Sequence, residues 1–201
     1  MVAHAQPGAE VRGPPMTVAP EIWTIGHWTC PVPEFLQPLH EHGIGVVVDV
    51  RAHPGSRRNP QFGSDAMAKW LPDAGITYLH LAELGGRRRK QGADPTLNVG
   101  WKNASFRNYA DYTLTEEYEA GITRLTGLAS GTPTAVMCGE PMPWRCHRLL
   151  ISNTLTARGW TVWHLMGESA PRRHQLGQWG AVPVVDRLQR VTYPGGLSSD
   201  G

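Results

Sequence analysis

Val46, Val47 and Val48 form an unbroken apolar run that ends at Asp49. A strand with one face in water alternates apolar and polar residues, so a continuous run predicts a strand buried on both faces. Strands of this kind lie centrally in parallel sheets that helices cover from both sides. The chain is therefore expected to form an α/β fold.

Further short apolar segments are separated by segments with helical periodicity. The predicted strands are residues 22–25, 45–50, 77–81, 135–137 and 161–165, and the predicted helices are 33–42, 64–74, 106–114, 116–129 and 145–158. A capping-box pattern at Thr113 and Glu116 precedes the fourth helix. The alternation implies right-handed crossovers and one three-layer domain, with a mainly parallel central sheet of about five strands and helices on both faces.

The length of 201 residues suits a single domain. We expect a flexible leader over residues 1–20, the α/β domain over 21–168 and a weakly ordered C-terminal tail over 169–201. The chain lacks the roughly 18 consecutive apolar residues of a membrane span, so no membrane partner is expected. Three cysteines are too few for a disulfide framework, which favours the cytoplasm.

The formal net charge is only +2, which excludes a generic polyanion binder. Basic residues nevertheless cluster at 51–58, 87–90 and 145–148, so any recognition of an anion is expected to be local. A nucleotide or a short contact with nucleic acid is the expected partner, and the sequence does not indicate the oligomeric state.

Open parallel sheets bind ligands beyond the carboxyl ends of their strands, where Asp49 and Arg51 follow the central strand. Two residues apart, these side chains point to the same side of the strand. They could face a cleft or form a structural ion pair.

The segment 138–148 concentrates a thiol pair, a carboxylate, an imidazole and guanidinium groups. These candidates are Cys138, Glu140, Cys146, His147 and Arg148. At a helix N-terminus, free N–H groups and the helix dipole favour anions and lower a thiol pKa. The cysteines could instead be small buried hydrophobes. The two cysteines and the histidine could hold a metal, but their spacing matches no common structural zinc pattern, so neither a metal nor a cofactor is predicted.

Glu140 is a candidate general acid or base whose pKa could be tuned by burial against Trp144 or by nearby arginines, or it could simply pair with Arg145 or Arg148.

Gly85, Gly86 and Arg87 open a basic run in the long irregular region 82–104. This run suits phosphate contacts in a lid or ligand-facing loop, and it equally suits a solvated loop.

Tyr109 and Tyr112 follow this basic run and could stack a nucleobase while nearby cations hold its phosphates. Three residues apart on a helix, they could equally be core residues.

Five separated motifs resemble the bacterial and archaeal family catalogued as domain of unknown function 488, over about residues 22–165. They are Thr24-Ile25-Gly26-His27, Val48-Asp49-Val50-Arg51, Leu84-Gly85-Gly86, Tyr109-Ala110-Asp111-Tyr112 and the segment from Cys138 to Arg148. Gly139 departs from the alanine that the family more often has there. The resemblance implies the fold and the location of the site, and adds His27 to the ligand-binding candidates, but it implies no reaction.

Our leading hypothesis is an enzyme that acts on a nucleotide or a nucleic-acid base, including DNA, as a hydrolase of an N-glycosidic bond. Glu140 or Asp49 would activate water, His147 would orient Glu140 or bind the leaving group, and Tyr109 or Trp144 would stack the base. The phosphate would be held by Arg51, Arg57, Arg87 and Arg148. The alternatives are a non-catalytic binding module and a thiol- or metal-dependent centre at Cys138 and Cys146.

Overall fold

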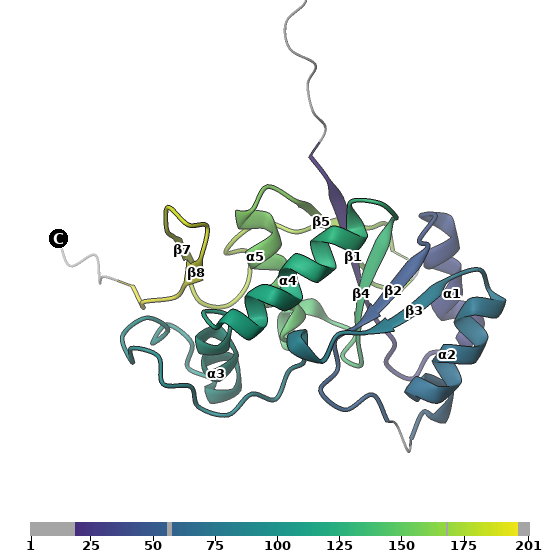
Figure 1. Ribbon diagram of the computed structural model, residues 1–201, viewed down its shortest axis with the longest axis horizontal. Helices are drawn as coiled ribbons and strands as arrows, with labels where there is room; N and C mark the ends of the chain where they lie inside the picture. Colours follow the sequence, from purple (N-terminus) through teal and green to yellow (C-terminus); the bar gives the residue numbers. More distant parts are fainter. Residues whose placement is uncertain (1–18, 56–57, 168, 197–201) are drawn as a thin grey trace, which may run out of the picture.

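The computed structural model describes residues 19–55, 58–167 and 169–196, and its centre is a six-stranded, mostly parallel sheet (Figure 1). The strands, in chain order, are β1 (Glu21–Gly26), β2 (Val46–Asp49), β3 (Thr77–His80), β4 (Thr134–Cys138), β5 (Thr161–Leu165) and β6 (Arg172–Arg173). In the sheet they follow the order β3-β2-β4-β1-β5-β6, and only β6 runs antiparallel to its neighbour. The predicted α/β fold is confirmed, with one short strand more than expected.

Five helices cover the two faces of this sheet: α1 (Val32–Glu41), α2 (Ser64–Asp73), α3 (Ala104–Tyr112), α4 (Glu116–Ala129) and α5 (Arg148–Ala157). The helices α1 and α2 pack on one face around Phe35, Met67 and Val47, and the other three pack on the opposite face around Tyr118 and Val48 (Figure 1). Among the described helices, none is long and apolar enough to cross a membrane.

Short elements complete the chain: the 3-10 helices η1 (Pro60–Phe62), η2 (Ala82–Leu84) and η3 (Pro143–Arg145), and the hairpin of β7 (Val184–Val185) and β8 (Val191–Thr192). The residues 172–193, predicted from the sequence as part of a weakly ordered tail, contribute β6 and the buried side chains of His174 and Tyr193. The Tyr193 backbone also pairs with Leu97 and Gly100 of the long irregular region.

Two helix starts differ from the prediction. The N-cap of α4 is Thr115, whose hydroxyl accepts a hydrogen bond from the Tyr118 N–H, whereas Thr113 ends α3 and donates its hydroxyl to Ala110. The capping box predicted at Thr113 is therefore wrong by two residues. The last helix begins at Arg148 instead of residue 145, because η3 ends at Arg145 and the extended backbone of the following Cys146 (φ −133°, ψ 149°) interrupts the helical course.

The connections place a crevice at the carboxyl end of β4. The chain leaves β1 and β2, the two neighbours of β4, into α1 and α2 on one face of the sheet, but leaves β4 towards α5 on the other face. Loops that diverge in this way leave room between them, and in α/β sheets this is where ligands bind.

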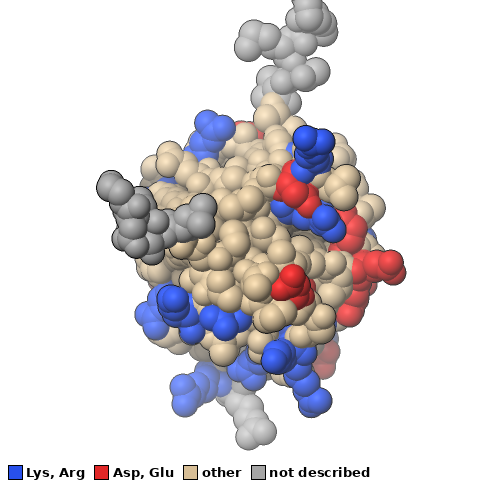
Figure 2. Space-filling model, turned by 90° about the vertical axis from the view of Figure 1, so that its left-hand side faces the viewer, with Lys and Arg blue, Asp and Glu red and all other residues tan. Residues whose placement is uncertain are grey.

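On the face drawn in Figure 2 the charged side chains do not form a single basic patch. Lys and Arg lie around the rim, including the upper right where they adjoin Asp and Glu, and the middle of this face is a broad uncharged area.

Candidate functional site

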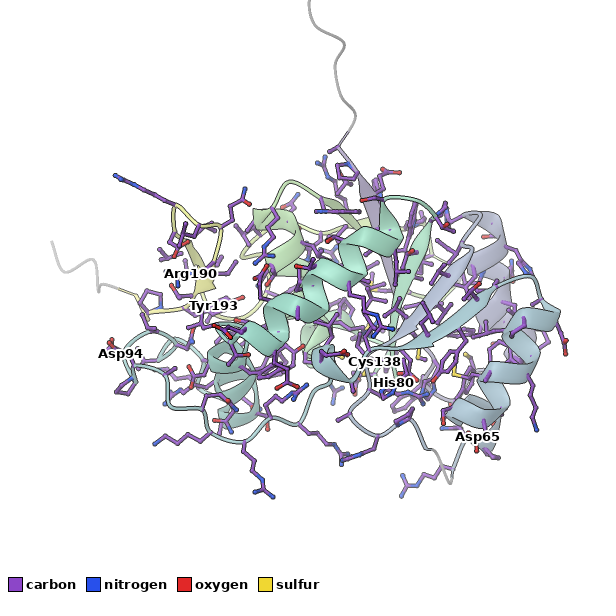
Figure 3. The ribbon with its side chains drawn as sticks, in the orientation of Figure 1. Asp65, His80, Asp94, Cys138, Arg190 and Tyr193 are labelled. Atoms are coloured by element: carbon purple, nitrogen blue, oxygen red, sulfur yellow. The ribbon has the colours of Figure 1, made fainter. Side chains whose placement is uncertain are left out.

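A cavity of about 340 Å³ lies at the carboxyl edge of the sheet, where the loops after β2, η2 and β4 meet. Its lining residues are Arg51, Ala52, His53, Gly55, Gly86, Arg87, Cys138, Gly139 and His147. None of these described lining residues is acidic, so the cavity combines cations, imidazoles and one thiol without a carboxylate. Figure 3 labels Cys138 at this end of β4 and His80 at the same end of β3, with β2 between the two strands.

Asp49 and Arg51 form a buried ion pair beside the cavity. Arg51 donates from Nε and Nη2 to both oxygens of Asp49, at distances from 2.6 to 3.1 Å, and Tyr78 donates its hydroxyl to Asp49 Oδ2 at 2.8 Å. Asp49 is completely buried. Because its oxygens are already occupied, the carboxylate holds Arg51 in place and is not available to activate water.

His27 supports the same arginine from the end of β1. Its Nδ1 lies 2.7 Å from the carbonyl oxygen of Trp28, to which it donates, and its Nε2 therefore accepts from Arg51 Nη1 at 3.1 Å. Burial, followed by the nearby Arg51 charge, lowers the pKa of His27 to about 4. The residue is thus a buried support for Arg51, and it also lines the larger of the two cavities.

Two thiols and one imidazole meet at the bottom of the crevice. The Sγ atoms of Cys138 and Cys146 and a ring nitrogen of His147 all lie within 4.8 Å of one another. Cys146 Sγ is 3.6 Å from His147 Nδ1 and accepts from Arg148 Nε at 3.5 Å. We call these three residues the Cys138–Cys146–His147 cluster.

A buried arginine, Arg148, lies beside this cluster. Arg148 is 1% exposed, its Nη2 donates to the carbonyl oxygens of Glu140 and Pro141, and no described carboxylate pairs with it. A buried cation requires a counter-charge, and Cys146 is the acidic group that its Nε contacts.

The surroundings of the two thiols shift their pKa values differently. Burial alone would raise the pKa of Cys146, but the hydrogen bond from Cys138 and the charges of His147 and Arg148 outweigh it and hold that pKa well below its ordinary value. The hydrogen bond to Cys146 and then burial raise the pKa of Cys138 well above its ordinary value. The pKa values of the two thiols are therefore shifted in opposite directions.

The orientation of His147 is fixed from two sides. Its Nε2 lies 2.9 Å from the carbonyl oxygen of Val50, which can only accept, so Nε2 carries a proton and Nδ1 faces Cys146 Sγ at 3.6 Å. Gly86 lies against the same ring, because a Cβ atom at this position would be 2.7 Å from Nδ1. The glycine predicted as a phosphate contact therefore also makes room for the imidazole.

The predicted phosphate loop contributes one side chain to the cavity. Arg87 is exposed, lines the cavity and has a positive φ of 58°. Gly85 is tightly packed, because a Cβ atom added at this position would lie 2.9 Å from the carbonyl oxygen of Ala82. Arg57 lies outside the described residues.

The structure places both predicted stacking tyrosines in the core. Tyr109 and Tyr112 are 1% and 2% exposed, and their hydroxyls donate to the carbonyl oxygens of Leu84 and Glu83. Neither ring is free to stack a base in this conformation. They hold η2, and through it the glycine loop, against α3.

Glu140 and Trp144 lie outside the described lining of the cavity. The Glu140 side chain is 30% exposed and 3.9 Å from Arg145 Nε, a loose pair at the surface. Trp144 is partly exposed, with its ring centroid 4.8 Å from that of Trp179. Glu140 approaches the cluster through its backbone, which also contacts Gly26 so closely that a Cβ atom there would lie 2.0 Å from Glu140 O.

Sequence reasoning missed His53 and Tyr78. His53 lines the cavity from the loop after β2, and it could have been identified by the same rule that selected Arg51. Tyr78 reaches Asp49 from β3, a strand pairing that residue types alone do not reveal.

A larger cavity of about 690 Å³ lies between α1 and the connection that follows β5. It is lined by apolar and aromatic residues such as Trp28, Phe35 and Met142, together with Glu34. No member of the Cys138–Cys146–His147 cluster lines it, so its size does not make it the centre of the chemistry.

Fold and site together define an α/β protein with a dithiol–imidazole cluster beneath a cationic cavity at the carboxyl edge of a parallel sheet. The sequence model of the family described as domain of unknown function DUF488 matches residues 31–155. The chain belongs to this family, which confirms the resemblance seen in its motifs. Comparisons with curated proteins and with solved structures gave no significant match.

Proposed function

We propose that this protein is a hydrolytic enzyme that binds a nucleotide, or another small phosphate-bearing molecule, in the 340 Å³ cavity. The observation that carries the proposal is the lining of the cavity, in which Arg51, Arg87 and His53 surround Cys138 and His147 without a described carboxylate. A cleft lined by cations attracts phosphate and places it beside reactive groups.

The geometry changes the roles proposed from the sequence. Asp49 is held by Arg51 and Tyr78, so a reaction in this cavity depends on the Cys138–Cys146–His147 cluster instead of on that carboxylate. Glu140 retains a role only if its surface side chain turns towards the substrate. The buried tyrosines leave base recognition to loop residues around the cavity.

Substrate binding is tested by calorimetric titration of the full chain with nucleoside monophosphates, ribose phosphate and inorganic phosphate. Replacing Arg87 by Gln removes one cation from the cavity and should weaken binding about tenfold, the effect of losing a charge-assisted hydrogen bond. Arg89→Gln is the matched control, because Arg89 belongs to the same basic run and is exposed but does not line the cavity.

Catalysis is tested by incubating the protein with the ligand that binds and separating the products by chromatography. Free base would identify N-glycosidic cleavage, and free phosphate would identify phosphate ester hydrolysis. Binding without turnover would mean that the protein is a binding module. Absence of binding, or equal losses in Arg87→Gln and Arg89→Gln, would refute the proposed cavity.

A further inference from the structure

We propose that Cys138, Cys146 and His147 are the ligands of a zinc ion whose fourth position opens into the cavity. This inference deepens the proposed function by supplying its reactive group. The catalytic role of the metal rests on the proposed function, but the existence of the metal site does not, because metal binding can be measured without any substrate.

The three donor atoms already lie at distances that one metal ion can bridge. A tetrahedral zinc ion with bonds of about 2.3 Å to sulfur and about 2.0 Å to nitrogen holds those two atoms roughly 3.5 Å apart. Cys146 Sγ and His147 Nδ1 are 3.6 Å apart, and Cys138 Sγ is within 4.8 Å of both. Two thiolates and an imidazole select zinc over the hard cations magnesium and calcium.

The surroundings of the donors match those of metal ligands. Histidines that bind metals usually donate their other ring N–H to a carbonyl or carboxylate, which fixes the tautomer. His147 does this through Nε2 to Val50 O, which directs Nδ1 to the sulfur atoms, and metal binding would take the neutral form of the ring. Cys146 in turn receives a hydrogen bond from Arg148 Nε at 3.5 Å, a second contact that orients a donor atom.

Gly86 keeps the space beside the nitrogen donor free of a side chain. A Cβ atom at this position would lie 2.7 Å from Nδ1 and 3.1 Å from Cε1 of His147. A larger residue at this position would therefore clash with Nδ1, the nitrogen proposed to bind the metal. The glycine thus serves the imidazole as well as the turn after η2.

The open position follows from exposure. Cys138 and His147 line the cavity, whereas Cys146 lies behind them and is 5% exposed. Three protein ligands with one free position facing a cleft are typical of catalytic zinc, and structural zinc sites are closed by a fourth protein ligand. Two thiolates would neutralise the charge of the ion, and the charge of Arg148 would remain beside Cys146.

Linear spacing does not contradict this arrangement. Cys138 ends β4 and Cys146 follows η3, so a loop separates the two thiols and folds back to bring them together. The third thiol, Cys30, lies elsewhere: its S–H donates to His27 O at 2.8 Å. Cys30 is therefore an internal control of the same chemistry.

The test uses the full chain, stripped of metal with a chelator under a phosphine reductant and titrated with Co²⁺ and then Zn²⁺. One Co²⁺ per chain should give the absorption of a tetrahedral thiolate site, and Zn²⁺ should abolish it. Cys138→Ser, Cys146→Ser and His147→Gln should each weaken the metal affinity at least tenfold, whereas Cys30→Ser should bind like the unmodified chain. Circular dichroism shows which variants are folded.

Absence of the thiolate absorption in the folded, reduced chain would overturn the proposal, as would equal affinities of Cys30→Ser and folded Cys138→Ser. If the cluster variants do not fold, X-ray absorption of the zinc-loaded chain decides, since two sulfur neighbours are required. Metal binding without nucleotide binding would refute the proposed function alone. Nucleotide turnover at full rate by metal-free protein would refute the metal as its reactive group.

Discussion

His147 Nε2 donates a hydrogen bond of 2.9 Å to the carbonyl oxygen of Val50, 97 residues earlier in the chain. This single contact joins the residue that precedes α5 to the end of β2 and determines which ring nitrogen faces Cys146. Gly86 confines the same ring from the side of the glycine loop. The position of the imidazole therefore depends on three segments that are distant in sequence.

Replacing Gly86 by Ala should weaken zinc binding about tenfold or more while leaving all three ligands in place. The added Cβ atom would lie 2.7 Å from Nδ1, so the ring has to move. Cobalt titration measures the affinity. Gly92→Ala is the control, because Gly92 lies in the same irregular region and an added Cβ atom meets nothing within 4 Å; an equal effect of both changes would contradict the proposed confinement.

Replacing Asp49 by Asn should destabilise the fold by about 3–5 kcal/mol, since Arg51 would remain buried without its counter-charge. Urea denaturation measures the free energy of unfolding. Glu119→Gln, which breaks the more exposed pair with Arg158, should cost no more than about 1 kcal/mol. The double change Asp49→Asn with Arg51→Met should restore part of the loss; no recovery would mean that the pair is not the cause.

Stability should fall as the pH drops from about 6.5 towards 4. Thr24, His164, His174, Asn153 and Tyr193 form a buried chain of hydrogen bonds in which each imidazole donates once and accepts once. Burial lowers the pKa of His174 to about 4, and burial together with the His174 charge lowers that of His164 to about 3.

The sign follows from proton uptake. Below pH 6.5 both imidazoles are protonated in the unfolded chain but not in the folded chain. Proton binding therefore lowers the free energy of the unfolded state relative to the folded state, by about 3 kcal/mol for His174. Below the folded pKa values the loss is complete. His174→Gln should show a shallower decline of the unfolding free energy between pH 7 and pH 4.5 in urea titrations. An unchanged slope would contradict the neutral, buried state of His174.

Two glycine-to-alanine changes should have opposite signs. At Gly26 a Cβ atom would lie 2.0 Å from Glu140 O and 2.7 Å from Pro141 Cα, so Gly26→Ala should destabilise the fold by several kcal/mol, about 3 or more. At the exposed helical position Gly127 nothing lies within 4 Å, and Gly127→Ala should stabilise by about 0.5–1 kcal/mol. Thermal unfolding compares the two, and a stable Gly26→Ala variant would contradict the close approach of the loop after β4.

The layers of the fold could be predicted because their signals are local. The three valines of β2 and the alternation of strands and helices are visible in the sequence, and each of the five parallel strands was expected. β6 was not, since Arg172 and Arg173 are exposed and form a strand only by pairing with β5. Tyr193 likewise becomes buried through partners far away in the chain.

The location of the candidate site was also predictable, but the state of its residues was not. The carboxyl-edge rule places Arg51, Cys138 and His147 together. Whether Asp49 is free or occupied depends on Tyr78 from another strand, and whether Tyr109 stacks a ligand or fills the core depends on how η2 packs. Such distinctions arise from tertiary contacts.

The position of β1 between β4 and β5 limits how this protein can be dissected. The region that the family model matches, residues 31–155, contains β4 but neither β1 nor β5. A fragment cut to those limits would leave the hydrogen-bonding edge of β4 unpaired along its length, and unpaired apolar edges recruit strands from other molecules. Recombinant pieces intended for biochemistry should therefore retain both flanking strands, so that β4 stays paired with β1 and β1 with β5.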